Sequence, residues 1–520
     1  MVLALAALLL VSAVIFALPL GRRPLDNQDE ARYSLLAREA AEHGHWILPR
    51  VRDEVYLNKP PLFFWTVALF ALPFRAVTDA TAPIASVVSA LVGLLAVFAI
   101  GRLLWGAAVG LASALVLATS PFYFFMAHQV LTDMMLTAWM TWALYFYLAA
   151  GRAQNPRRWL IWFYLCVAGG LASKGPAALM VLAAAVVASL AADGWSGLKR
   201  LRLALGLALI ALTALPWLVP YLLQGEKSYG RTVVLTDYLG WYFRSAVTSR
   251  LAEVAVHLAR FLPWAFFLLP AAWWWTREPD PDRKRLLLWA ATLMALLSLS
   301  GEQRARYFLP LWPLFALFVA EFCVRGAERA RGLLDWAAAV YLVVMIGTGG
   351  FLIWGTVSGT DAVFLPAAPW ERWTVAVAIV VGAAAALLSL RVDQSGLVAS
   401  AWLAVGLGIA LTVTALEYPP RFTRVNDYPG VARRVAAKLD PAQTLLAYPD
   451  ANLAWDFYLR TPVREIRSEK EATALLAASP TGRVLMRSDD WQRLKSRADA
   501  AWRALDEGQV GRRRFVLLGG

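Results

Sequence analysis

Long apolar runs occupy most of this chain and limit what it can fold into. A helix needs about 20 mostly apolar residues to cross a bilayer, within a range of roughly 17–25. About thirteen runs approach that length, and only 17% of the residues are charged, against roughly 25% in soluble domains. The sequence therefore predicts a polytopic α-helical membrane protein. The runs lie near residues 1–20, 82–101, 107–125, 134–150, 159–173, 176–192, 203–222, 255–276, 286–300, 306–324, 335–355, 373–390 and 396–416.

One shorter apolar run, residues 62–74, decides the expected orientation. It follows two prolines, and its length is typical of an interfacial or re-entrant segment rather than a span. If it does not cross, four basic loops fall on one side, which the positive-inside rule makes cytoplasmic. These loops lie around residues 152–158, 199–202, 277–285 and 325–331. We therefore expect 62–74 to be a juxtamembrane helix in the first outer loop, after an uncleaved first transmembrane helix.

The C-terminal part differs from the rest, because short apolar runs alternate there with amphipathic stretches. Strands are expected near Gln443–Tyr448, Arg483–Ser488 and Arg514–Leu518, and helices near 428–438, 468–478 and 489–505. This pattern predicts a small soluble α/β domain over residues 421–520, on the outer side. Residues 1–420 would form a transmembrane catalytic domain that includes an outer juxtamembrane active-site segment at 21–75.

The first outer loop should contain a helix. Asp26 or Asn27 can cap it, it would run to about Glu42, and Gly44 would follow its end. Its apolar face could lie along the membrane surface. That face is formed by Tyr33, Leu36, Ala37 and Ala40.

Three charged side chains of this loop are candidates for function. Asp29 and Glu30 fall in the first turn of the helix, where acids either complement the helix dipole or act on a substrate. Lys59 precedes Pro60 and Pro61, which fix the backbone and present the ammonium group at a rigid corner. A compact cation at the headgroup level suits a phosphate, although lysine also extends to the interface without any ligand. Both alternatives stay open for all three residues.

Further candidates lie at later outer turns. Asp133 stands where the chain re-enters the membrane as a helix, and a carboxylate in apolar surroundings needs a partner or a function, or else caps that helix. Lys174, Arg306 and Tyr307 belong to outer turns whose positive charge opposes the positive-inside trend. This exception indicates an anionic ligand. Two outer carboxylates, Asp29 and Asp133, could position or deprotonate an acceptor.

Several classes of function are not supported by the sequence. The net charge of +14 lies mostly in short loops, where it indicates topology and contacts with membrane lipids, and no nucleic-acid-binding motif accompanies it. Cys166 and Cys323 lie in separate apolar runs, which argues against a disulfide or a cysteine metal site. The four histidines lack zinc-site spacing, and no phosphate-loop, dinucleotide or hydrolase motif is present.

The segment DEARYSLLAREAAEHGHWILPRVRDEVYLNKPPLFFW, residues 29–65, resembles the N-terminal signature of the bacterial polyprenyl-phosphate-sugar glycosyltransferases of the C-type membrane fold. The lipid A aminoarabinose transferases are the most similar group, and the protein O-mannosyltransferases are more distant relatives. Weaker matches continue through VLTD, SKGP and RYFLPLWP, which contain Asp133, Lys174, Arg306 and Tyr307.

The resemblance implies an inverting transfer of a sugar from undecaprenyl phosphate to lipid A or another envelope acceptor, at the periplasmic face of the bacterial inner membrane. It makes Asp29 the principal catalytic carboxylate and Asp133 its partner. Lys59, with Arg306 or Tyr307, would bind the lipid phosphate. The same donor could also serve a transferase that acts on a protein or another glycan.

Asn58 is a departure from the family pattern. The lipid A enzymes usually have an acid directly before Lys-Pro-Pro, and in some relatives it holds a metal together with a histidine from a later outer loop. Here the 223–254 loop has no histidine, so the expected metal ligands are not evident and no metal-binding residue is predicted. Two non-catalytic functions also remain open: a transporter of a lipid-linked sugar, or a structural membrane component. The absence of internal repeats and the gathering of charge on one side favour the enzyme.

Overall fold

The computed structural model describes most of the chain, in two compact units. The described residues are all except 1, 26, 53, 225–253, 255, 278–279, 301–303, 359–367, 393–394, 440–443, 450–451, 462, 479 and 481. The first unit contains Met1–Leu18, Leu57–Phe63 and Ala85–Leu416. The second contains Pro19–Tyr56, Phe64–Ile84 and Glu417–Gly520, so that residues 19–56 and 64–84 fold together with the C-terminal residues.

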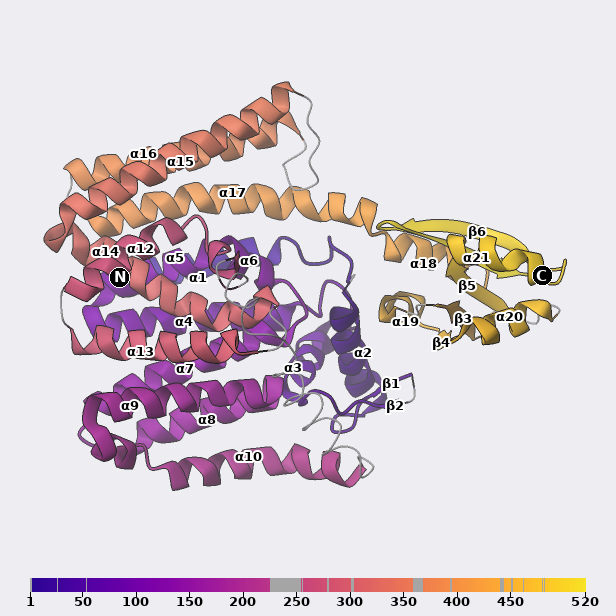
Figure 1. The fold of residues 1–520 in the computed structure, drawn as a ribbon, viewed down its shortest axis with the longest axis horizontal. Helices are drawn as coiled ribbons and strands as arrows, with labels where there is room; N and C mark the ends of the chain where they lie inside the picture. Colours follow the sequence, from indigo (N-terminus) through magenta and orange to yellow (C-terminus); the bar gives the residue numbers. More distant parts are fainter. Residues whose placement is uncertain are drawn as a thin grey trace. The chain divides into compact units, whose positions relative to one another are not determined.

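The first unit is a bundle of long apolar helices (Figure 1). Its helices are α1 Val2–Ala17, α4 Ile84–Trp105, α5 Ala107–Ala118, α6 Pro121–Ala127, α7 Thr132–Arg152, α8 Arg157–Lys174, α9 Leu179–Arg200, α10 Leu203–Gln224, α12 Ala265–Arg277, α13 Pro281–Ser298, α14 Trp312–Arg329, α15 Arg331–Val357 and α16 Pro369–Val392. Helix α17, Gly396–Val425, continues from this unit into the second.

Among the described residues, seven helical segments are long and apolar enough to cross a membrane, or eight if α5 and α6, bent by 69°, form one span. The chain is therefore a polytopic helical membrane protein, as the sequence predicts. The number of thirteen spans stays a prediction. The apolar run after Pro61 forms the short helix α3, Leu62–Ala71, and a 3₁₀ turn, Leu72–Phe74.

Helices α4 and α5 pack closely because glycines face each other between them. A Cβ atom on Gly101 would lie 2.7 Å from the Cα atom of Gly110, closer than real side chains come. Small residues at such positions let helix backbones approach inside a membrane, where packing rather than the hydrophobic effect joins helices.

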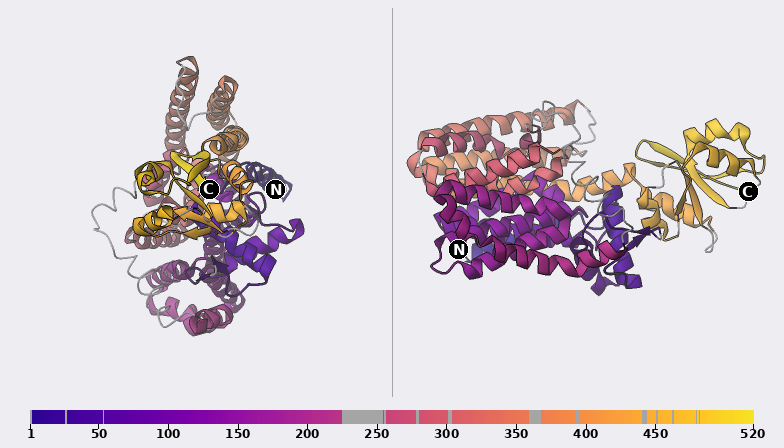
Figure 2. Two further views of the ribbon diagram at one scale, coloured as in Figure 1. Left: turned by 90° about the vertical axis from the view of Figure 1, so that its right-hand side faces the viewer. Right: turned by 60° about the horizontal axis from the view of Figure 1, so that its bottom comes forward.

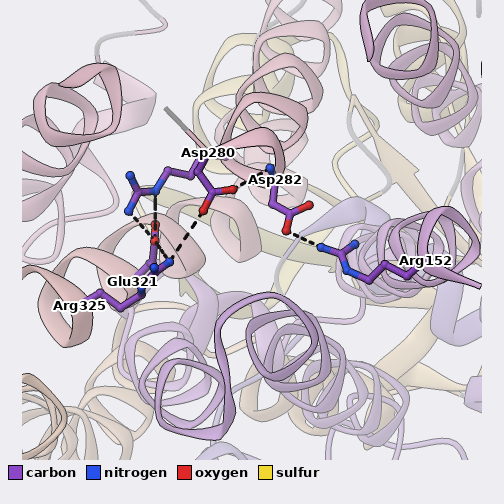
Figure 3. Close-up of polar contacts among 6 residues, drawn as sticks. Arg152, Asp280, Asp282, Glu321 and Arg325 are labelled. Atoms are coloured by element: carbon purple, nitrogen blue, oxygen red, sulfur yellow. Dashed lines mark hydrogen bonds and ion pairs between the residues drawn. The ribbon is translucent and has the colours of Figure 1, made fainter. Parts of the chain in front are cut away.

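A buried ionic network joins α13 to α14 (Figure 3). The Arg283 Nη2 atom lies 2.8 Å from Glu321 Oε1, and both side chains are at most 2% exposed. Arg325 Nη1 lies 2.9 Å from the same carboxylate and 3.8 Å from Asp280. Nearby, Arg152 at the end of α7 donates to Asp282 at 2.5 Å, which joins α7 to the start of α13 (Figure 3).

The C-terminal part of the second unit is a mixed five-stranded sheet with helices (Figure 2). The strand order is β4-β3-β5-β7-β6; β3 is parallel to β4 and β5, while β7 is antiparallel to β5 and β6. Leu446 opposes Val484 in the parallel pair. The elements are α18 Tyr428–Ala436, β3 Leu445–Tyr448, α19 Leu453–Leu459, β4 Val463–Glu465, α20 Glu469–Ala477, β5 Arg483–Arg487, α21 Ser488–Leu494, β6 Arg503–Val510 and β7 Arg513–Gly519.

The expected helix over 489–505 is wrong in its second half. Helix α21 ends at Leu494, a 3₁₀ turn follows, and strand β6 begins at Arg503. Asp499 forms a turn before the strand, because its side chain accepts a hydrogen bond from the Ala501 N–H. Trp502 then joins the core of the sheet.

Candidate active site

Asp133 is the centre of a cationic cluster in the first unit. Helix α7 begins at Thr132, so Asp133 lies in its first turn, and it is 3% exposed. Lys174, the last residue of α8, donates a hydrogen bond from Nζ to Asp133 Oδ1. The Nε atom of Arg306 lies 3.9 Å from Asp133 Oδ2. Each of these residues was predicted at a separate outer turn, and the structure brings them together.

Tyr307 completes the cluster. The Lys174 Nζ atom lies 4.5 Å from the centroid of its ring, a favourable cation–π arrangement. Arg306 and Tyr307 stand in a 3₁₀ helix, Ala305–Leu311, that packs beside α7. Lys174 is placed by the end of α8, where Gly175 takes a positive φ of 76° and stops the helix.

The cluster brings two cations, Lys174 and Arg306, to one carboxylate, Asp133. Both cationic side chains are only 13% exposed, so their charge acts in a medium less polar than water. Asp133 holds the two cations side by side, and a small anion that reached them would form charge-assisted hydrogen bonds with their donors. The arrangement suits a phosphate.

Lys59 belongs to the same unit and lies at a fixed corner. Pro60 and Pro61 are buried, and the Tyr221 hydroxyl of α10 donates to the Lys59 carbonyl at 3.4 Å. Tyr221 itself is fully buried, so the backbone at Lys59 is anchored to a membrane helix. The side chain is half-buried.

The second unit presents the acidic helix α2, Gln28–His43. The Asn27 side chain accepts from the Asp29 N–H at 2.9 Å, and Gly44 ends the helix with a φ of 74°. The predicted cap by Asn27 and the predicted end at Gly44 are confirmed; Asp26 lies outside the described residues. The apolar face of α2 is buried within the protein rather than lying along the membrane surface.

The two acids of the first turn have different environments. The side chain of Asp29 is 20% exposed, and its Oδ1 accepts from Arg32 Nη1 at 2.6 Å. Glu30 is fully buried, and its two oxygens accept from both terminal nitrogens of Arg23, at 2.6 and 3.0 Å. Asp29 can therefore reach a substrate, whereas Glu30 anchors the start of the helix.

Sequence reasoning did not identify Arg23, or any residue of α19, as a contact of helix α2. Arg23 and Glu30 are separated by Pro24 and by the helix cap, so no helical periodicity pairs them. The residues of α19 follow more than four hundred positions later and belong to no motif. Only the fold could show these contacts.

In the part of the chain that the structure describes, no group of three or more His, Cys, Asp or Glu residues could hold a metal ion. Asn58, which stands where the family pattern has an acid, is exposed. Most of the 223–254 loop lies outside the described residues.

Comparison with known proteins agrees with this architecture. Residues 58–219 match the family described as dolichyl-phosphate-mannose-protein mannosyltransferase. The undecaprenyl phosphate-alpha-4-amino-4-deoxy-L-arabinose arabinosyl transferase of Pectobacterium carotovorum is 29% identical over 63% of this chain and 60% of its own length. The enzyme of the same name from Aeromonas salmonicida is 28% identical over 81% of this chain and 80% of its own. The chain thus spans about three fifths of the first of these relatives.

The fold is similar to that of a solved structure. The crystal structure of ArnT from Cupriavidus metallidurans bound to undecaprenyl phosphate superposes with a TM-score of 0.80 at 21% identity, and the match covers 98% of this chain and 97% of that one. The predicted resemblance to polyprenyl-phosphate-sugar glycosyltransferases of the C-type membrane fold is confirmed. In sequence, the chain is similar to the bacterial aminoarabinose transferases.

Proposed function

We propose that this protein is an inverting glycosyltransferase that moves a sugar from undecaprenyl phosphate to lipid A or another cell-envelope acceptor. The observation on which this rests is the convergence of Lys174, Arg306 and Tyr307 on Asp133, in a chain whose fold matches a protein bound to undecaprenyl phosphate. The proposal includes a site on the periplasmic face of the bacterial inner membrane, with residues 421–520 on the same side.

The donor phosphate is assigned to the cationic groups. When the bond between the anomeric carbon and the phosphate oxygen breaks, its electron pair goes to that oxygen, and negative charge grows there. Lys174 and Arg306 stabilise such charge in place, because Asp133 already holds them. Lys59, on its proline-fixed corner, and the Tyr307 ring complete the phosphate site. These cations lower the barrier by stabilising the leaving group.

The acceptor is assigned to Asp29. A single displacement requires the acceptor oxygen to attack the anomeric carbon opposite the leaving phosphate, which inverts the configuration. A phosphate acceptor on lipid A is already an anion and needs only orientation. A hydroxyl acceptor would give its proton to the Asp29 carboxylate as the new bond forms. Glu30, paired with Arg23, anchors the start of the helix that carries Asp29.

A second acceptor class has its own support. The family that matches residues 58–219 is described as acting on proteins, so a protein or glycan hydroxyl is the alternative acceptor. The donor chemistry would be unchanged, and Asp29 would then serve as general base.

The test compares wild type with Asp29→Asn in lipid nanodiscs, supplied with undecaprenyl-phosphate aminoarabinose and with lipid A or a peptide acceptor. We expect the wild type to release undecaprenyl phosphate and the variant to lose at least about 100-fold in kcat. Asp489→Asn, an exposed acid of α21, is the matched control. Full activity in Asp29→Asn would remove the carboxylate assignment. Donor that crosses the bilayer of sealed proteoliposomes containing the protein, without being consumed, would establish a transporter instead.

A further inference from the structure

Three consecutive residues of the short helix α19 contact three separate parts of the N-terminal outer segment. Asp456, Phe457 and Tyr458 lie in the C-terminal sequence, and their partners lie between Gly21 and Asp79. All of these residues belong to the second compact unit. The contacts join the segment that contains Asp29 to the mixed sheet.

Of the three residues of α19, Tyr458 has the partner that is nearest to Asp29 in sequence, namely Leu25. The Tyr458 hydroxyl accepts a hydrogen bond from the Leu25 N–H at 2.7 Å and donates to Asp79 Oδ2 at 3.5 Å. Leu25 is fully buried and lies just before the cap of α2. A buried N–H group without a partner is strongly unfavourable, so Tyr458 fixes the backbone at this point. Burial raises the pKa of Tyr458, which keeps the hydroxyl neutral and able to serve both neighbours.

Asp456 and Phe457 hold two other parts of the segment. The Arg52 guanidinium donates to both Asp456 oxygens, at 3.0 and 2.7 Å, which is the paired geometry that arginine forms with carboxylates. Arg38, on α2, donates to the Phe457 carbonyl at 3.1 Å, and its guanidinium carbon lies 4.4 Å from the Phe457 ring centroid. Arg38 also donates to the Val77 carbonyl at 3.4 Å.

The chain before α2 has contacts with the end of α17 as well. Thr423 donates from its hydroxyl to the Arg22 carbonyl at 2.9 Å. The Arg23 guanidinium carbon lies 5.9 Å from the Phe422 ring centroid while it pairs with Glu30. Residues on both sides of Asp29 are thus held by groups that come from beyond residue 416.

We propose that α19 is a positioning element of the transferase, and that Tyr458, with Asp456, sets the place of Asp29 by fixing the start of α2. This rests on the proposed function, because it assigns the C-terminal part of the chain a role in the acceptor side of that reaction. The lipid phosphate is bound by other residues, so loss of Tyr458 should lower kcat and leave donor binding unchanged.

The first test replaces Tyr458 by Phe in the full-length protein in nanodiscs. We expect kcat to fall about tenfold, since a small misplacement of a reacting group is enough for such a loss, while KM for the donor stays within about twofold. Tyr448→Phe is the matched control, because Tyr448 lies in β3 and packs in the core of the same sheet. Asp456→Asn should lower kcat in the same direction by about threefold.

The second measurement does not depend on activity. Hydrogen–deuterium exchange of peptides that cover residues 19–33 should be at least about threefold faster in Tyr458→Phe than in wild type, and unchanged in Tyr448→Phe. Unchanged exchange with full activity in Tyr458→Phe would overturn the proposal. An equal loss of kcat in both variants would also overturn it, because it would indicate a general weakening of the sheet. If the wild type transfers no sugar, the proposed function fails, and the exchange result still decides whether Tyr458 positions α2.

Discussion

Asp133 and Glu321 each receive two cationic side chains, yet the ion pairs at the centres of the two clusters differ in burial. In the pair of Arg283 with Glu321 the side chains are 2% and 0% exposed, whereas in the pair of Lys174 with Asp133 they are 13% and 3% exposed. Arg325 and Asp280 also take part at Glu321, and Arg306 at Asp133. A fully buried pair joins helices, whereas cations that keep some exposure can meet an anion.

The largest effect is expected from Glu321→Gln, which removes the fully buried carboxylate charge that pairs with Arg283. Removing one partner of such a pair is expected to lower the free energy of unfolding by about 3 kcal/mol or more. Thermal unfolding in detergent would measure it. The molecules that remain folded should keep the wild-type KM for the donor. A large change in donor KM would make this cluster part of the binding site and break the comparison.

Lys174→Met should have the next largest effect, of the opposite kind. Loss of one cation beside the leaving phosphate should reduce kcat by about 100-fold, while the free energy of unfolding falls less than in Glu321→Gln, because Arg306 still lies beside Asp133. Binding of undecaprenyl phosphate should weaken in the same variant and stay unchanged in Glu321→Gln. If both variants bind undecaprenyl phosphate like wild type, the burial of the central ion pair does not distinguish an anion site from a structural cluster.

Arg306→Lys sharpens the comparison, because it keeps the charge and removes the planar fork of donors. We expect kcat/KM to fall about tenfold, less than for a change that removes the charge. Steady-state kinetics with the undecaprenyl-phosphate sugar would show it. Equal losses in Arg306→Lys and Arg306→Met would mean that geometry, not charge, is what this residue supplies.

The smallest effect is expected from Arg325→Ala. Its side chain is 25% exposed and lies at the rim of the Glu321 cluster, and Arg283 still neutralises the buried carboxylate. The free energy of unfolding should fall by about 1 kcal/mol or less, with unchanged activity. Thermal unfolding beside Glu321→Gln provides the comparison. A loss as large as that of Glu321→Gln would show that both arginines are needed.

Much of the local structure could be predicted from the sequence because its causes are local. Apolar length places the helices, and Asn27 and Gly44 mark the ends of α2 through their own side-chain and backbone preferences. The pattern over 489–505 misled because the Asp499 turn depends on one short-range hydrogen bond inside a stretch that otherwise suits a helix.

The contacts of the candidate site could not be predicted in this way, because they depend on how distant elements pack. Asp133 and Lys174 were each identifiable as a charge at an outer turn, but their pairing depends on how α7 packs against α8. The sequence around Tyr458 does not indicate a functional role, because a tyrosine in a short helix is usual in any α/β domain. Its role is set by a partner 433 positions away in the chain.

That separation has a consequence for synthesis. Leu25 leaves the ribosome before helices α4 to α17 are made, and Tyr458 only after them. Domains generally fold as units, so the contacts that hold the start of α2 form only once α19 has been synthesised. A chain that stops after α17 would contain the helices of the first unit and the acidic helix, but not the contacts that hold that helix. Synthesis of α19 and assembly of the segment that contains Asp29 are therefore coupled.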